Sequence, residues 1–155
     1  MDGYQQLVAQ ALETVDEVMP WDLEEELEQN AQLFLLDIRE ADEFAMMHIK
    51  NSVHVPRGVL EGACCWNYDD TVPALASARD QDVVVICRSG NRSVLAAQSM
   101  QQLGFTRVRS LKLGIKGWND NDIEMVDGQG NIVDIDAADE WLNTPVPADK
   151  LDPNN

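Results

Sequence analysis

One short stretch of the chain combines a nucleophile with cations. It reads Cys87-Arg88-Ser89-Gly90-Asn91-Arg92-Ser93, so a guanidinium follows the thiol at once and a second lies beyond four intervening residues. The thiolate is the reactive form of cysteine, and nearby cations favour it. A free cysteine at the end of a strand is otherwise often only a small buried hydrophobe. The flanking arginines and glycine favour the alternative, covalent chemistry at the Cys87 sulfur.

The segments on either side of Cys87 predict how it is positioned. Val83–Ile86 is a run of four β-branched residues, typical of a strand buried on both faces of a parallel sheet. Asn91–Leu103 has apolar residues at helical spacing. Cys87 is therefore expected at the carboxyl end of a strand, where open α/β sheets bind ligands. Loop N–H groups and the start of the helix would stabilise an anion there.

The remaining chain alternates predicted strands and helices, which indicates an α/β fold with a mostly parallel sheet. The expected strands are Val15–Val18, Phe34–Ile38, Ser52–Val55 and Arg107–Leu111. The expected helices are Tyr4–Glu13, one beginning at Pro20, Ala41–Met46 and Val72–Ala78, with a short turn or helix near Trp118 and one or two helical turns over Asp136–Leu142. Residues 127–131 form a turn signal for a small hairpin, and the prolines after residue 144 predict an extended tail anchored by Trp141.

Several ordered motifs resemble one family. Residues 87–93 are similar to the active-site loop of the rhodanese (thiosulfate sulfurtransferase) family. The resemblance extends over residues 15 to 120 and includes these further matches: Leu36–Glu40, Glu43-Phe44, His48-Ile49, Val55–Gly58, Leu103–Phe105, and Leu111 with Gly114 and Gly117-Trp118. Met47 and Leu113 depart from it, because the family often has glycine at these two positions. They put the shape of the cleft in doubt, but not the cysteine chemistry.

The resemblance implies a three-layer sandwich, with a helical extension at residues 1–14, the family domain at 15–120 and an acidic extension at 121–155. It also implies a function. Cys87 would carry a persulfide, cradled by Arg88, Ser89, Gly90, Asn91, Arg92 and Ser93. The donor would be thiosulfate or a persulfide, and the acceptor cyanide in vitro or a thiol or sulfur-carrier protein in vivo. Neither a cofactor nor a metal is expected, since the two histidines lack ligand spacing with the cysteines.

Two other functions remain open. Phosphatases and arsenate reductase-like enzymes of related fold carry five residues between the cysteine and the arginine, whereas this chain has four. The alternative of a non-enzymatic interaction or sulfur-binding module is weakened by the intact Cys87. Arg92 is expected to brace the loop and Arg88 to attract an anionic donor. Neighbouring Cys64 and Cys65 are interpreted as packing residues, with a persulfide relay as the sharper alternative.

Other polar residues near the motifs have structural interpretations. Asp37 and Arg39 are expected to form an internal ion pair. His48 is expected to make a structural hydrogen bond, and His54 to have no special role.

Charge is distributed unevenly along the chain. The net charge of −17 comes from 28 acidic and 11 basic residues. Residues 1–33 and 119–155 each carry a net −9, while residues 34–118 carry +1. No basic footprint for nucleic acid and no apolar span for a membrane is present. The acidic flanks are interpreted as solubilising, with a docking surface for a basic partner as the alternative. Three cysteines are too few for a disulfide scaffold, so we expect a cytoplasmic protein.

Overall fold

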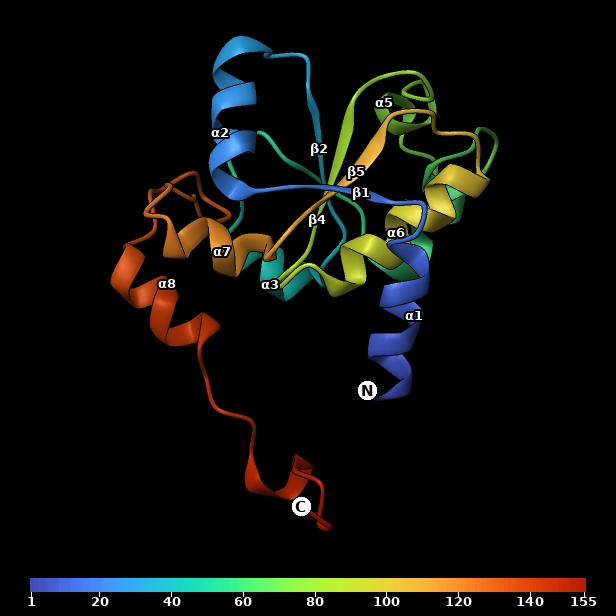
Figure 1. The fold of residues 1–155 in the computed structure, drawn as a ribbon. Coiled ribbons are helices and arrows are strands. Elements are labelled where there is room, and N and C mark those ends of the chain that lie inside the picture. The colour runs from blue at the N-terminus through green and yellow to red at the C-terminus, as the bar shows by residue number, and fades with distance from the viewer.

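A five-stranded parallel sheet forms the centre of the computed structural model, which describes residues 1–155 (Figure 1). The strands lie in the order β1-β5-β4-β2-β3. Their bounds are β1 Asp16–Val18, β2 Phe34–Asp37, β3 Val53–His54, β4 Val83–Ile86 and β5 Val108–Leu111. Every pairing is parallel, as the alternation of strands and helices predicts.

The central strand β4 is buried on both faces, as its run of β-branched residues predicts. Val83 to Ile86 are all fully buried, and β4 pairs with β2 on one side and β5 on the other. Successive side chains point to opposite faces, so Val83, Val85 and Cys87 enter one core while Val84 and Ile86 enter the other. Cys87 is thereby fixed at the carboxyl edge of the sheet.

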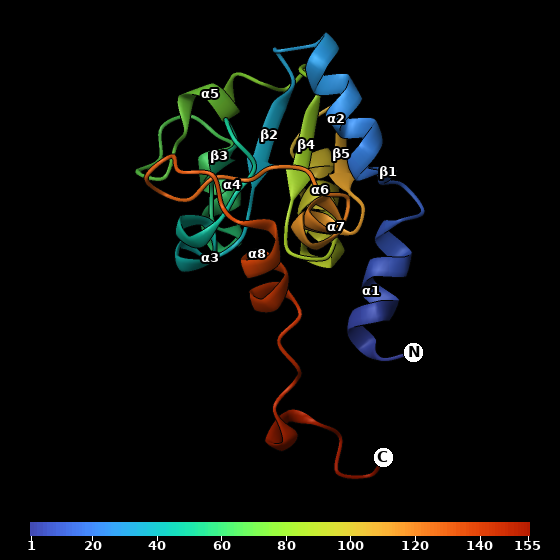
Figure 2. The same ribbon diagram turned by 90° about the vertical axis from the view of Figure 1, so that its left-hand side faces the viewer.

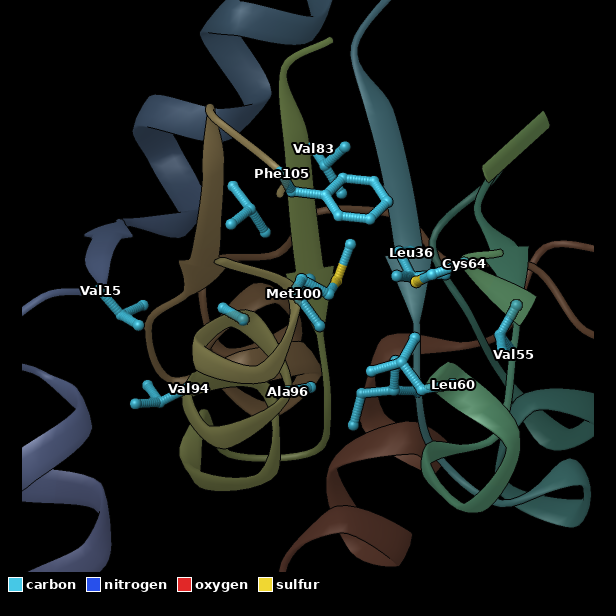
Figure 3. Packing of buried hydrophobic residues seen from close by; sticks show 14 of the residues in the cluster. Val15, Leu36, Val55, Leu60, Cys64, Val83, Val94, Ala96, Met100 and Phe105 are labelled. Atoms are coloured by element: carbon cyan, nitrogen blue, oxygen red, sulfur yellow. The ribbon is translucent and has the colours of Figure 1, made fainter. Parts of the chain in front are cut away.

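Helices cover the face of the sheet that lies on the right in Figure 1. They are α1 Gly3–Ala11, α4 Leu60–Ala63, α5 Pro73–Ala76 and α6 Asn91–Gln102. Figure 3 shows how Met100 of α6 and Phe105 pack against Val83 and Leu36 of the sheet. Val8 and Ala11 of α1 belong to the same core, so the N-terminal helix is packed into the domain.

The second face is covered by α2 Pro20–Gln29, α7 Gly114–Asp120 and α8 Ile135–Leu142, while α3 Ala41–Met46 lies near the carboxyl edge (Figures 1 and 2). Ala138 and Leu142 of α8 are buried in this core with Leu111 and Trp118. Both segments that flank the family-like region thus contribute apolar side chains to a core. The predicted division at residues 14/15 and 120/121 stays a prediction.

Most predicted elements are present with small shifts of their ends. The helix predicted over Val72–Ala78 is only the four-residue α5, and the strand predicted over Ser52–Val55 is only the two-residue β3. The turn at residues 127–131 forms, but the expected hairpin is reduced to a single antiparallel bridge between Val126 and Ile132. Val126 also forms an antiparallel bridge with His48.

After α8 the chain runs away from the body as an extended tail with one short 3₁₀ turn, η2 Ala148–Lys150 (Figure 1). A further short 3₁₀ turn, η1 Arg57–Val59, precedes α4. None of the helices combines the length and the apolar character needed to cross a membrane.

Candidate active site

Cys87 lies at the centre of the loop that joins β4 to α6. Its side chain is only 1% exposed, and its Sγ accepts hydrogen bonds from the backbone N–H groups of Gly90 at 3.1 Å and Ser93 at 3.3 Å. Gly90 makes this closed loop possible, because its φ of 100° is a conformation that side-chain-bearing residues rarely adopt. Two N–H groups, one of them in the first turn of α6, therefore converge on the sulfur.

A chain of two buried hydroxyls continues from the sulfur into the sheet. Ser93 Oγ lies 3.2 Å from Cys87 Sγ and 2.7 Å from the hydroxyl of Ser110 on β5. Both serines are fully buried. A thiol at Cys87 donates to Ser93 Oγ, and rotation of the two hydroxyls lets Ser93 donate to a thiolate instead. The site can therefore hydrogen-bond either protonation state of Cys87.

The start of α7 holds the first half of the loop. The N–H groups of Ile115 and Lys116 donate to the carbonyls of Cys87 and Arg88, both at 3.0 Å. A Cβ at Gly114 would overlap the backbone of Cys87 and Arg88, so only glycine permits this approach. The glycine motif that precedes Trp118 thus has a direct role in fixing the loop.

The residue before Gly114 adopts a strained conformation. Leu113 has a φ of 68°, in the left-handed region that favours glycine, and its side chain is 44% exposed. Met47, the other departure from the family pattern, has an extended φ of −163° and is buried in the second core. Leu113 therefore keeps a glycine-like backbone without glycine, whereas the backbone at Met47 does not require one.

Arg92 is held by a carboxylate outside the loop. Its two terminal nitrogens donate to the two oxygens of Glu43 on α3, each at 2.9 Å. Burial acts to raise the pKa of the Glu43 carboxyl, but the hydrogen bonds from Arg92 and from the Glu40 backbone hold it below its usual range. This bidentate ion pair braces the start of α6 against α3.

Asp37 and Arg39 form the predicted internal ion pair, and Arg39 lies beside the backbone of Glu43. Both side chains are completely buried, and Arg39 Nη2 lies 2.8 Å from Asp37 Oδ2. Arg39 also donates to the carbonyl of Met47 at 2.6 Å. The pair thus ties the end of β2 to the chain that follows α3 and has no solvent-exposed polar group left for catalysis.

The two histidines support the same region. His48 Nδ1 lies 2.8 Å from the Phe44 carbonyl, as expected of a structural hydrogen-bonder, and its ring stacks on Phe44. His54 Nε2 lies 2.7 Å from the carbonyl of Arg39, and the His54 ring also stacks on Phe44. Neither histidine is a hydrogen-bond partner of Cys87.

Arg88 turns toward the C-terminal helix. Its Nη2 donates to the Leu142 carbonyl at 2.5 Å, and its guanidinium carbon lies 5.8 Å from the centre of the Trp141 ring. Trp141 and Leu142, in the last turn of α8, therefore anchor the tail to the active-site loop, as predicted for Trp141. Asn91 and Ser89, the other predicted loop residues, are exposed.

The N-terminal helix approaches the site from another side. Burial raises the pKa of Tyr4 on α1, with the charge of Cys87 adding to the rise and that of Arg92 opposing it. In Figures 1 and 2, α1 and α8 both extend past the carboxyl edge of the sheet. Both acidic flanking segments thus border the loop.

The other two cysteines lie in a separate environment. Burial raises the pKa of the Cys64 thiol to about 11, which makes it a poor nucleophile. The half-buried Cys65 accepts a hydrogen bond from Arg79 Nη2 at 3.6 Å. All hydrogen-bond partners of the Cys87 sulfur come from its own loop and α6, so neither Cys64 nor Cys65 is hydrogen-bonded to the sulfur it would have to relay.

Sequence reasoning missed three contributors to the site: Ser110, Glu43 as the partner of Arg92, and Leu142 as the acceptor for Arg88. Alternation along β5 places Ser110 on the same face as the buried Val108, which was a usable signal for a buried hydroxyl. The contacts of Glu43 and Leu142 join residues 49 and 54 positions apart, and no local pattern encodes such distances.

Residues 19–121 match the family model described as a rhodanese-like domain. The chain is 28% identical over 116 residues to a protein named sulfurtransferase from Allochromatium vinosum, covering 75% of this chain and 99% of that one. It is 30% identical over 94 residues to YrkF of Bacillus subtilis, named provisionally as a sulfur carrier protein. That match covers 61% of this chain but only 45% of YrkF.

A solved structure from Rhodopseudomonas palustris has a similar fold. It is described as a protein of unknown function and possible tyrosine phosphatase, and it superimposes with a TM-score of 0.71 over 79% of this chain and 92% of its own. The two sequences are 24% identical, so this likeness concerns the fold.

Proposed function

The chain belongs to the rhodanese-like domain family, and from this premise we propose that it transfers sulfane sulfur through a persulfide on Cys87. The donor is thiosulfate or a persulfide, and the acceptor is a thiol or a sulfur-carrier protein, with cyanide as a substitute in vitro. The single observation that carries the proposal is the convergence of two backbone N–H groups and one hydroxyl on Cys87 Sγ.

With thiosulfate, the reaction has two balanced steps. The Cys87 thiolate attacks the outer sulfur of thiosulfate, the S–S bond breaks, and sulfite leaves with the bonding electron pair. The acceptor's nucleophile then attacks the outer sulfur of the Cys87 persulfide, and the Cys87 thiolate leaves. The hydrogen bonds to Sγ stabilise the negative charge of this leaving thiolate, in the manner of an oxyanion hole.

The held positions of the two arginines refine their roles. Arg92 braces the loop, because both of its terminal guanidinium nitrogens donate to Glu43 rather than to a ligand. Arg88 gives one nitrogen to Leu142 and keeps its charge beside the loop for donor attraction. The remaining loop residues, Ser89 to Ser93, form the cradle, with Gly90 and Ser93 supplying its N–H groups.

The size of the loop supports sulfur over phosphorus chemistry. Only four residues separate Cys87 from Arg92, and the N–H groups of Gly90 and Ser93 already lie within hydrogen-bond distance of the sulfur. A tetrahedral phosphate needs a wider ring of donors. A pure binding module would have no need for this set of bonds to a buried thiol.

The reaction requires a reducing compartment such as the cytoplasm, because Cys87 must remain a free thiol. All three cysteines are free, and two of them are buried. No group of three or more metal-ligating side chains is assembled, and none of the proposed steps uses a metal.

Steady-state formation of thiocyanate from thiosulfate and cyanide tests the proposal. The parent protein is expected to turn over, Cys87→Ser to be inactive, and the matched variant Cys65→Ser to keep the parent rate. Circular dichroism of the three proteins controls for folding. An active Cys87→Ser protein would rule out the proposed persulfide.

A further inference from the structure

A groove lies beside the active-site loop, between the loop and the chain that leaves α8. Its volume is about 440 Å³, and one wall consists of Arg88, Ser89 and Lys116. The opposite wall is the segment from Leu142 to Val146, which we call the strap. Volumes of roughly 300–1,000 Å³ are usual for sites that bind small molecules. The groove reaches the loop one residue from Cys87.

The groove has an unusual charge for this protein. The chain contains 28 acidic and 11 basic residues, yet two bases and no Asp or Glu line the groove. Arg88 and Lys116 are both half-buried, so solvent screens their charges less than those of fully exposed side chains. The groove is therefore suited to a small anion.

The Arg88 guanidinium and the backbone of Lys116 are fixed. The backbone N–H of Lys116 donates to the Arg88 carbonyl at 3.0 Å, and Arg88 Nη2 donates to the Leu142 carbonyl. The latter bond joins the two walls. On the strap, the backbone N–H groups of Thr144 and Val146 have no hydrogen-bond partner in the chain, so each can donate to a bound carboxylate.

We propose that this groove binds the carboxylate of a low-molecular-weight thiol, whose sulfur then accepts the outer sulfur of the Cys87 persulfide. The inference rests on the proposed function and specifies the class of its acceptor. The acceptor's thiolate attacks the outer sulfur, the bond from that sulfur to Cys87 Sγ breaks, and Cys87 leaves as a thiolate. The product is the acceptor's persulfide, so no external oxidant or reductant is needed.

A small acceptor fits better than an acidic carrier protein. The negative charge is concentrated in the two flanking segments that border the loop, so it repels an acidic macromolecule that approaches the loop, whereas a small anion interacts mainly with the local cations. The strap also closes one side of the groove and so limits the space for a folded partner.

Binding is tested first, without any sulfur transfer. S-methylglutathione, which has carboxylates but no free thiol, is titrated into the 15N-labelled protein. We expect the amide signals of Lys116, Thr144 and Val146 to shift, and Lys116→Gln to weaken binding roughly threefold, as is usual for one partly exposed charge pair. Lys112→Gln, an exposed lysine outside the groove, is the matched control and should leave the affinity unchanged. Shifts confined to other parts of the chain would overturn the proposal.

Selectivity between acceptors is tested second. The protein is loaded with sulfur, its mass is checked, and its discharge by glutathione is compared with discharge by uncharged 2-mercaptoethanol. Val146 is 60% exposed, so its substitution should not disturb folding. We expect Val146→Lys to raise the glutathione preference roughly twofold and Val146→Asp to lower it by a similar factor.

The outcomes separate this inference from the proposed function. If Cys87 loads fully but the preference is equal in the parent, Val146→Lys and Val146→Asp, the groove is not the acceptor site, while the sulfurtransferase activity stands. If Cys87 does not load at all, the proposed function fails, and this inference fails with it.

Discussion

The ion pair between Arg92 and Glu43 offers a quantitative test of how the loop is supported. The perturbation is Glu43→Gln, which keeps the shape of the side chain but removes its charge and faces an amide NH₂ toward a guanidinium. The parent has two charge-assisted hydrogen bonds of 2.9 Å, with side chains that are 34% exposed at Arg92 and 17% exposed at Glu43. A fully buried bond to a charged group is worth roughly 1.5–3 kcal/mol. Partial exposure reduces this, so we expect a loss of about 1.5 kcal/mol for the pair.

Urea unfolding at pH 7 measures this loss as a change in the midpoint at constant slope. Asp42→Asn is the matched control, because Asp42 is an exposed neighbour on the same helix. The brace acts on the loop rather than on the donor, so turnover should fall while the Michaelis constant for thiosulfate changes little. The reasoning is refuted if Glu43→Gln and Asp42→Asn have the same midpoint and the same turnover.

The same pair predicts a pH dependence. The folded-state pKa of Glu43 is lowered relative to its unfolded value, so its stabilisation is complete above the unfolded pKa of about 4.3 and is lost as the pH falls through the folded pKa. The difference in unfolding free energy between the parent and Glu43→Gln should therefore be constant from pH 6 to 8 and shrink below about pH 4. A difference that grows on acidification would contradict the assigned direction.

Three further predictions concern the loop and its support. Leu113→Gly should raise the free energy of unfolding by about 0.5–1 kcal/mol, because relief of the left-handed strain exceeds the cost of the added backbone entropy of the unfolded chain. Urea unfolding measures the change, and a clear destabilisation would contradict the assigned strain. Gly114→Ala should destabilise the protein by about 2 kcal/mol or more and abolish sulfur loading, because the new Cβ overlaps the backbone of Cys87 and Arg88; a stable, active variant would disprove the close approach. The parent should hydrolyse aryl phosphates negligibly under conditions where thiocyanate formation is easily measured, and one glycine inserted between Ser89 and Asn91 should weaken sulfur transfer; robust phosphatase activity in the parent would refute the argument from loop size.

Local patterns predicted the features of this fold that are encoded locally. The β-branched run of β4 and the apolar spacing of α6 placed Cys87 at a strand-to-helix junction, because burial on both faces requires such a strand. The ion pair of Asp37 with Arg39 was also accessible, since its members are two residues apart.

Other features depend on tertiary packing and had no local signal. The region after Val72 has helical composition, but the chain must turn toward β4 after only four helical residues. Val126 exchanges both of its backbone hydrogen bonds with His48, which is far away in the sequence and which no local turn signal encodes. The turning of Arg88 toward α8 depends on where the C-terminal helix docks, which the apolar residues of α8 determine only together with the second core.

Intact-mass spectrometry of the protein after thiosulfate treatment shows whether Cys87 carries the transferred sulfur. We expect one added sulfur atom, about 32 Da, on the parent and its removal by cyanide. Cys87→Ser should gain no mass, whereas Cys64→Ser and Cys65→Ser should gain the same increment as the parent. An increment that persists in Cys87→Ser, or its absence from a folded parent, would contradict the assignment of Cys87 as the sulfur carrier.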